Sequence, residues 1–252
     1  MLKTIITGQP TDKPALLVAH GLFGSGRNWG VIARRLSDER QVIAVDMRNH
    51  GESDWFATHS YGEMADDLAE VIADHGAPMD VLGHSMGGKA AMVLALTRPE
   101  LVRKLIVADI APVGYSHTQI HLAQAMQALD LDQINSRAEA DQILQSREDD
   151  PSVRAFLLQS LDLKSKKWRL NLDVLSAEMA GIIGFPEVSG QFSGPAFFLS
   201  GGDSTYVKRE YRPEIKRLFP AARFAKIPGA GHWLHAEKPR EFENAVRVWL
   251  DR

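Results

Sequence analysis

The sequence predicts an α/β fold with a mostly parallel central sheet, helices on both faces and a helical cap insertion. One observation is that short apolar, β-branched segments alternate with longer segments of helical periodicity, which is typical of parallel strands joined by crossover helices. Another is that several short segments are apolar throughout, as strands covered on both faces are. The third is that this alternation stops between about residues 112 and 194.

The predicted strands are short segments rich in apolar and β-branched residues, and the first of them reads as an edge strand. They are Leu2–Thr7, Ala15–His20, Gln41–Asp46, Met79–His84, Lys104–Asp109, Pro195–Gly201 and Arg223–Pro228. Helices are predicted where apolar residues recur at helical spacing, and a proline suits the first turn of the last one. They are Trp29–Leu36, Tyr61–His75, Met86–Arg98, Lys208–Phe219 and Pro239–Leu250.

Residues 112–194 form a mostly helical stretch between two predicted core strands. The expected helices are Gln119–Leu129, Ala138–Arg147, Val153–Ser160 and Leu172–Met179, and glycines from Gly181 onward mark the return to the sheet. Because this stretch has no strong core pattern of its own, we expect a dependent cap rather than an independent domain. The α/β core would then comprise residues 1–111 and 195–252, with the cap over the carboxyl edge of the strands, where open α/β sheets place their sites.

Composition narrows the class of protein. The 252 residues fit one large domain with an insertion, and 44% hydrophobic with 24% charged residues is ordinary for a globular protein. A net charge of −3 gives no reason to expect a nucleic acid or a membrane as partner. The absence of cysteine excludes a thiolate nucleophile. The start lacks a signal-peptide pattern, so we expect a cytoplasmic protein. We also expect a monomer or homodimer, and no metal.

The segment Gly83-His84-Ser85-Met86-Gly87 lies between a predicted strand and a predicted helix. Gly-x-Ser-x-Gly in that context is typical of a nucleophile elbow, in which the serine projects from a sharp turn. Gly83 and Gly87 would keep side chains out of a crowded turn. The helix that follows would direct its N-terminal amides toward a developing oxyanion. Ser85 is therefore the predicted nucleophile.

An overlapping pattern competes with this interpretation. Gly83, Gly88 and Lys89 have the spacing of a phosphate-binding loop in all but its last position. That position requires Ser or Thr to hold Mg²⁺, and Ala90 cannot do so. The nucleotide-binding interpretation is therefore disfavoured.

A general base and an acid are predicted further along the chain. His232 lies on a glycine-rich loop after the last predicted strand, where it can reach Ser85. His235 is its near rival, but it belongs more naturally to the entry of the final helix. Asp109 and Asp203 each follow a predicted strand, and the order Ser, Asp, His holds for both. The residues alone leave the choice of acid open.

The second oxyanion donor is expected in the loop after the strand Ala15–His20. Leu22 N–H together with Met86 N–H is the predicted pair, and Phe23 N–H is the second choice. Three other histidines near these motifs, His20, His50 and His84, are expected to hold loops and strand ends together.

Aromatic residues suggest an apolar substrate pocket. Phe23 and Trp233 adjoin the predicted catalytic loops, and Trp168 and Tyr206 are further candidates to line an acyl pocket. The cap also carries a basic cluster, for which contact with coenzyme A phosphates is a hypothesis. Its members are Lys164, Lys166, Lys167 and Arg169.

The motifs together resemble those of the α/β-hydrolase superfamily, and more narrowly those of the bacterial YbfF-type esterase group. The matching segments are HGLFGS (20–25), VDMRNHGES (45–53), GHSMGGKA (83–90), DIAPVGY (109–115) and GAGHWLHAEKP (229–239). The resemblance implies a serine esterase acting on carboxylic esters, with extension to acyl-CoA thioesters and without a cofactor. It also implies the triad Ser85, Asp109 and His232, because the family often has Asn at the position of Asp203.

Two other functions fit the same fold. A carbon–carbon bond hydrolase or lyase can use the same three residues. A non-catalytic ligand-binding scaffold is also possible on this fold, although the intact Ser–His pair argues against it.

Overall fold

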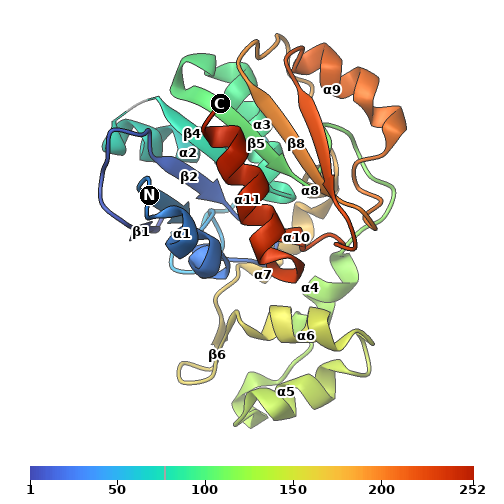
Figure 1. The fold of residues 1–252 in the computed structure, drawn as a ribbon. Helices are drawn as coiled ribbons and strands as arrows, with labels where there is room; N and C mark the ends of the chain where they lie inside the picture. Colours follow the sequence, from blue (N-terminus) through green and yellow to red (C-terminus); the bar gives the residue numbers. More distant parts are fainter. Residues whose placement is uncertain (77) are drawn as a thin grey trace.

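The computed structural model describes residues 1–76 and 78–252. Its main sheet has the strand order β1-β3-β2-β4-β5-β8-β9, and helices cover both faces (Figure 1). Every neighbouring pair is parallel except β1 with β3. The predicted mostly parallel α/β sheet is confirmed. The strands are β1 (Thr4–Thr7), β2 (Leu16–Ala19), β3 (Val42–Val45), β4 (Met79–His84), β5 (Val102–Ala108), β8 (Ala196–Gly201) and β9 (Arg223–Ile227).

The apolar strands form because both of their faces are buried. In β2, all four residues are buried, and alternate side chains enter two different core clusters. Leu17 and Ala19 belong to one cluster, whereas Leu16 and Val18 belong to the other. This is the period of two that a strand imposes on its side chains.

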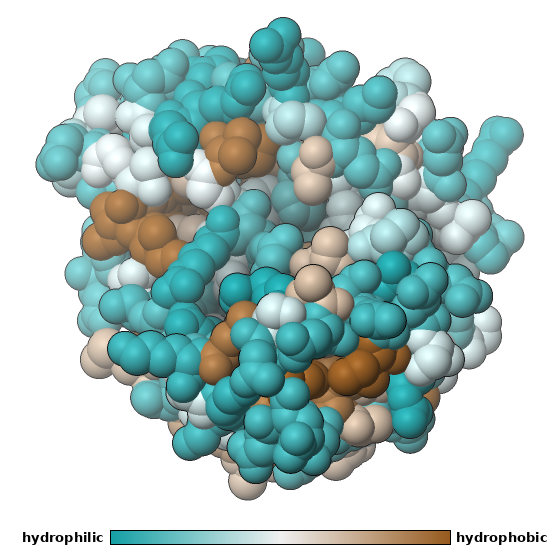
Figure 2. Space-filling view, turned by 90° about the horizontal axis from the view of Figure 1, so that it is seen from below, coloured by the Kyte–Doolittle hydropathy of each residue, from teal (hydrophilic) through white to brown (hydrophobic). Residues whose placement is uncertain are grey.

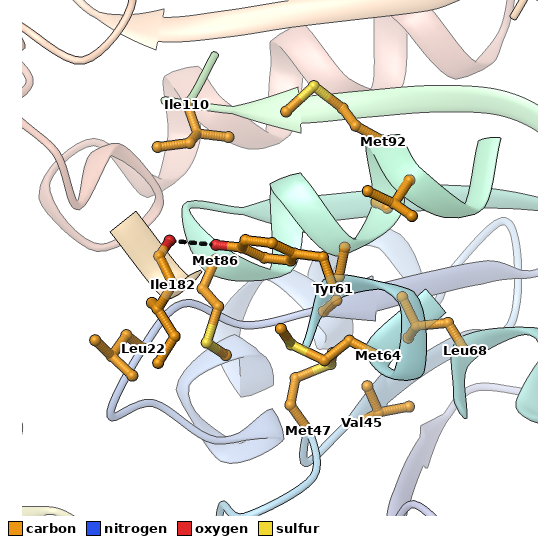
Figure 3. Packing of buried hydrophobic residues seen from close by; sticks show 14 of the residues in the cluster. Leu22, Val45, Met47, Tyr61, Met64, Leu68, Met86, Met92, Ile110 and Ile182 are labelled. Carbon is orange, nitrogen blue, oxygen red and sulfur yellow. Dashed lines mark hydrogen bonds between the residues drawn. The ribbon is translucent and has the colours of Figure 1, made fainter. Parts of the chain in front are cut away.

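The helices of the core divide between the two faces of the sheet. Side chains of α2 (Tyr61–His75), α3 (Met86–Thr97) and α9 (Arg212–Leu218) pack in the larger cluster, part of which Figure 3 shows. Side chains of α1 (Gly30–Leu36) and α11 (Pro239–Leu250) pack in the other. The start of α2 carries a capping box between Ser60 and Glu63, which satisfies free amides at the helix end.

Between β5 and β8 the chain forms a group of short helices, which lies below the sheet in Figure 1. Leu122, Met126 and Leu175 from this group belong to the same apolar cluster as α2 and α3. The helices therefore share an apolar core with the helices of the sheet. They are α4 (Ile120–Gln127), α5 (Arg137–Leu144), α6 (Pro151–Leu158), α7 (Leu172–Ala177) and α8 (Met179–Ile183).

The structure differs from the sequence prediction in several local elements. A two-stranded hairpin, β6 (Leu161–Asp162) with β7 (Lys167–Trp168), interrupts the cap helices. The Asp162 carboxylate accepts hydrogen bonds from the backbone of its turn, which stabilises it locally. Gly181 lies inside α8 rather than in the return to the sheet. The remaining short elements are α10 (Leu234–Glu237), η1 (Gly26–Trp29), η2 (Pro99–Leu101), η3 (Leu131–Gln133) and η4 (Arg209–Tyr211).

Within residues 1–76 and 78–252, no helix combines the length and the apolar character needed to cross a bilayer. The same residues hold no group of three or more His, Asp or Glu side chains suited to a metal ion. On the face shown in Figure 2, hydrophobic side chains form separate patches among hydrophilic ones.

Candidate active site

The turn between β4 and α3 holds Ser85 in an unusual backbone conformation, with φ 52° and ψ −120°. Its N–H donates to the carbonyl of Ala108 on the neighbouring strand at 3.1 Å, which ties the turn to the sheet. A Cβ atom on Gly83 would lie 2.2 Å from the carbonyl oxygen of Gly87. Only glycine at position 83 allows this close approach. The Ser85 hydroxyl is thereby presented at the carboxyl edge of the sheet.

His232 lies between Ser85 and Asp109. Its Nε2 is 3.1 Å from Ser85 Oγ, and its Nδ1 is 2.8 Å from Asp109 Oδ2. The Asp109 side chain is fully buried, whereas 14% of the His232 side chain is exposed. The geometry makes Nδ1 the donor to the carboxylate, which leaves Nε2 able to accept the proton of the serine hydroxyl.

Backbone and side-chain donors hold the Asp109 carboxylate in place. The N–H of Gly201 donates to Asp109 Oδ1 at 3.0 Å, and the Ser204 hydroxyl donates to Oδ2. Ser204 was not singled out from the sequence, where its only signal is its position beside Asp203 in the loop after β8. The other candidate acid, Asp203, is exposed, and His232 lies against Asp109 instead.

A second histidine supports the loop that carries His232. His84 Nε2 donates to the backbone carbonyl of His232 at 2.8 Å, and the two rings are 4.8 Å apart. Burial lowers the pKa of His84 well below its ordinary value, so the ring is neutral and Nε2 carries its proton. On the other side, the Tyr206 ring stacks on His232 at 3.9 Å. His232 is thus held through its backbone and through one ring face.

The loop after β2 and the start of α3 each place one backbone amide beside Ser85, that of Leu22 and that of Met86. Over residues 1–76 and 78–252, the N–H groups of Leu22 and Met86 have no hydrogen-bond acceptor. The N–H of Phe23 instead donates to His50 Nε2 at 3.2 Å. This corrects the second choice for an oxyanion donor, because the Phe23 amide is already occupied.

The histidines beside this loop have structural partners, as expected. His20 Nε2 accepts from the N–H of Met47 at 2.9 Å. His50 Nδ1 donates to the carbonyl of Arg48 at 2.9 Å. Burial lowers the pKa of His20 to about 4 and that of His50 to about 3, so both rings are neutral at physiological pH.

Ser85 lies between two open pockets. The first holds about 500 Å³ of space, part of which is open to solvent. Its lining includes core residues such as Phe23 and Trp233 and cap residues such as Val153 and Phe156. Its walls are mainly apolar and aromatic. The rings of Phe156 and Trp233 are 5.7 Å apart, so the cap and the loop of His232 meet at this pocket.

The second pocket encloses about 370 Å³ on the other side of Ser85. Its lining includes Tyr61, Lys89, Tyr115 and Tyr206. Leu22, Ser85 and Gln119 line both pockets. Ser85 therefore lies where the two pockets meet.

One expectation about the substrate pocket needs correction. Trp168 lines neither pocket; its ring nitrogen donates to the carbonyl of Met126 at 3.0 Å, and the side chain is buried in the cap. Trp168 therefore packs inside the cap and does not form part of a pocket wall. The basic cluster lies on and beside the β6–β7 hairpin, where Arg169 pairs with Glu52 and Asp162. Part of its charge is thus already neutralised.

Known proteins are similar to this chain over most of its length. The family model for the alpha/beta hydrolase fold matches residues 14–239. The chain belongs to the alpha/beta hydrolase family. As an alpha/beta hydrolase, it is 42% identical to the mouse (Mus musculus) "sn-1-specific diacylglycerol lipase ABHD11" over 94% of this chain and 81% of that protein. It is 39% identical to "Esterase YbfF" of Escherichia coli (strain K12) over 96% and 95% of the two chains.

A solved structure described as a marine microorganism esterase has the same architecture. The two chains superpose with a TM-score of 0.93 and are 36% identical, with 98% of each chain covered. The resemblance to the bacterial YbfF-type esterase group that the motifs predicted is confirmed.

Proposed function

We propose that this alpha/beta hydrolase hydrolyses carboxylic esters with Ser85 as nucleophile, His232 as general base and Asp109 as the acid of a triad. The observation that carries the proposal is the continuous hydrogen-bonded chain from Ser85 Oγ through His232 to Asp109 Oδ2. The names of the relatives, esterase and lipase, support the same enzyme class, a carboxylic ester hydrolase.

In the first half of the reaction, His232 Nε2 takes the proton of Ser85 as Oγ attacks the ester carbonyl carbon. The negative charge that forms on the carbonyl oxygen is stabilised by the free N–H groups of Leu22 and Met86. Asp109 stabilises the imidazolium without taking its proton. The ester bond then breaks, and the leaving alcohol receives the proton from His232.

In the second half, a water molecule attacks the acyl-enzyme while His232 takes its proton. The bond to Ser85 Oγ breaks, and His232 returns the proton to the serine. The products are a carboxylic acid and an alcohol. A thioester follows the same route with a thiol as leaving group, and we extend the proposal to acyl-CoA thioesters on that basis.

The test is steady-state hydrolysis of p-nitrophenyl esters from acetate to palmitate, beside acyl-CoA thioesters of matching length. Ser85→Ala should lower kcat by several orders of magnitude, as loss of a serine nucleophile does. A modest loss would contradict the role of Ser85. A fluorophosphonate probe should label the wild-type protein and not the variant.

Two outcomes would favour the other functions of this fold. Labelling without turnover of any ester or thioester would favour a carbon–carbon bond hydrolase or lyase. A folded wild-type protein that neither labels nor turns over would favour a non-catalytic scaffold.

A further inference from the structure

Lys89 lies on α3 one helical turn after Ser85, and its backbone N–H donates to the Ser85 carbonyl at 3.0 Å. Residues four apart on a helix share a face, so Lys89 lies on the same side of α3 as Ser85. Only 1% of the lysine is exposed, yet it lines the second pocket together with Ser85. A buried cation therefore lies within the same compartment as the reacting serine.

The ammonium of Lys89 has an incomplete set of partners. Nζ donates to the carbonyl of Ile183 at 2.8 Å and to that of Gly184, which leaves one of its three N–H bonds. The ring centres of Tyr115 and Tyr61 lie 4.8 and 5.8 Å away. Over residues 1–76 and 78–252, no carboxylate lies within ion-pair distance of Nζ. A buried charge without a counter-ion is unfavourable, and burial lowers the pKa of Lys89 to about 7.

Apart from Ser85 and Gln119, the other polar side chains of the second pocket are already paired. The Tyr61 hydroxyl donates to the carbonyl of Ile182 at 2.6 Å, as Figure 3 shows. The Tyr115 hydroxyl donates to the carbonyl of Tyr206 at 2.8 Å. The Tyr206 hydroxyl lies 2.9 Å from His117 Nε2. What remains is one positive charge in a wall made of aromatic rings and isoleucines.

We propose that the part of the substrate entering the second pocket carries a carboxylate, which Lys89 binds. This inference rests on the proposed ester hydrolysis and names its substrate class: a monoester of a dicarboxylic acid, or an ester of a hydroxy acid. The substrate would supply the counter-ion that the protein lacks, through a charge-assisted hydrogen bond to the remaining N–H. The first pocket would hold the other, apolar part of the ester.

Matched substrate pairs test this proposal. One pair places the carboxylate on the acyl side, monoethyl adipate against ethyl hexanoate. The other places it on the alcohol side, the acetate ester of a hydroxybutyrate against butyl acetate. In the wild-type protein, one charged ester should exceed its neutral partner in kcat/KM. The pair that shows the preference identifies which side of the ester enters the second pocket.

Lys89→Met keeps the length and the apolar stem of the side chain and removes the charge. It should lower the charged-to-neutral ratio of kcat/KM by about tenfold or more, the usual effect of losing a hydrogen bond to a charged group. The neutral ester is the internal control, because a variant with a damaged site would lose activity on both esters alike. An equal loss on both would overturn the proposal.

The wild-type protein gives a second test that needs no variant. As pH rises through about 7, Lys89 loses its proton, so the charged-to-neutral ratio should fall. Any effect of pH that is common to both esters divides out of the ratio. Equal kcat/KM for charged and neutral esters at every pH would overturn the inference and leave ester hydrolysis standing. No turnover of any ester would overturn both.

Discussion

The Ser204 hydroxyl donates a hydrogen bond to Asp109, on the same carboxylate oxygen that lies 2.8 Å from His232 Nδ1. The other oxygen accepts the N–H of Gly201 at 3.0 Å. Hydrogen-bond donors on both oxygens leave this fully buried carboxylate little freedom to rotate. Ser204 therefore determines how Asp109 faces His232.

Replacing Ser204 tests this arrangement. Ser204→Ala should lower kcat about tenfold, because one charge-assisted hydrogen bond to Asp109 is lost while that from Gly201 remains. KM should change little, since neither group contacts the substrate. The matched control is Thr205→Ala, which removes an exposed hydroxyl from the next residue. Equal kcat values for the two variants would contradict the prediction.

Replacing each of the two aspartates near the site by asparagine tests which of them is the acid of the triad. Asp109→Asn should lower kcat by roughly four orders of magnitude, because the amide favours the wrong tautomer of His232. Asp203→Asn should leave kcat within a few fold, since the Asp203 side chain is exposed. Steady-state hydrolysis of p-nitrophenyl butyrate by both variants decides the acid, and a larger loss in Asp203→Asn would reverse the assignment.

His84 is expected to act through His232. His84→Phe keeps an aromatic ring of similar size but removes the hydrogen bond to the His232 carbonyl. It should lower kcat by about tenfold and change KM little, because the base is less well placed. His84→Gln retains an N–H donor and should recover part of the loss. Recovery by Gln is the readout that a purely packing role for His84 would not produce.

Acid should destabilise the protein in the range where histidines titrate. Each buried ring has a pKa below its ordinary value because burial disfavours the charged form. As pH falls below about 6.5, the unfolded chain binds protons that the folded chain does not, so stability is full above that pH and declines toward the lower folded values. The rings are His20, at about 4, His50, His59 and His235, each at about 3, and His84.

Urea unfolding between pH 7.5 and pH 5 measures this loss. Each such histidine contributes about 1.4 kcal/mol per pH unit at most. His235→Phe keeps an aromatic ring against Trp29 and should make the decline shallower. A free energy of unfolding that stays constant down to pH 5 would show that these rings are not buried as neutral groups.

The fold was predictable from the sequence because strands such as β2 and β3 are apolar throughout and helices such as α2 carry their own start signals. The nucleophile was predictable because the constraints on Gly83 and Gly87 are local. The choice between Asp109 and Asp203 was not, since both follow parallel strands that end at one edge of the sheet. Long-range contacts from Gly201 and His232 distinguish Asp109.

The cap was harder to predict in detail. The strands of the β6–β7 hairpin have two residues each, too few to produce a periodic pattern. From the sequence alone, a tryptophan such as Trp168 in this hairpin looks the same whether its ring lines a pocket or packs in a core. Lys89 belonged to a pattern shared with phosphate-binding loops, and only the packing of Ile183 and Gly184 around it shows that it is buried.

The order of the elements along the chain also determines when the site is completed during synthesis. Ser85 and Asp109 precede the cap, whereas β8, β9 and the loop with His232 are the last parts of the sheet to leave the ribosome. A nascent chain that ends within the cap thus carries the serine without Ser204 to orient the acid and without His232 to accept its proton. In the proposed mechanism, Ser85 therefore stays inactive until the sheet is complete, because its activity depends on a contact that spans 147 residues.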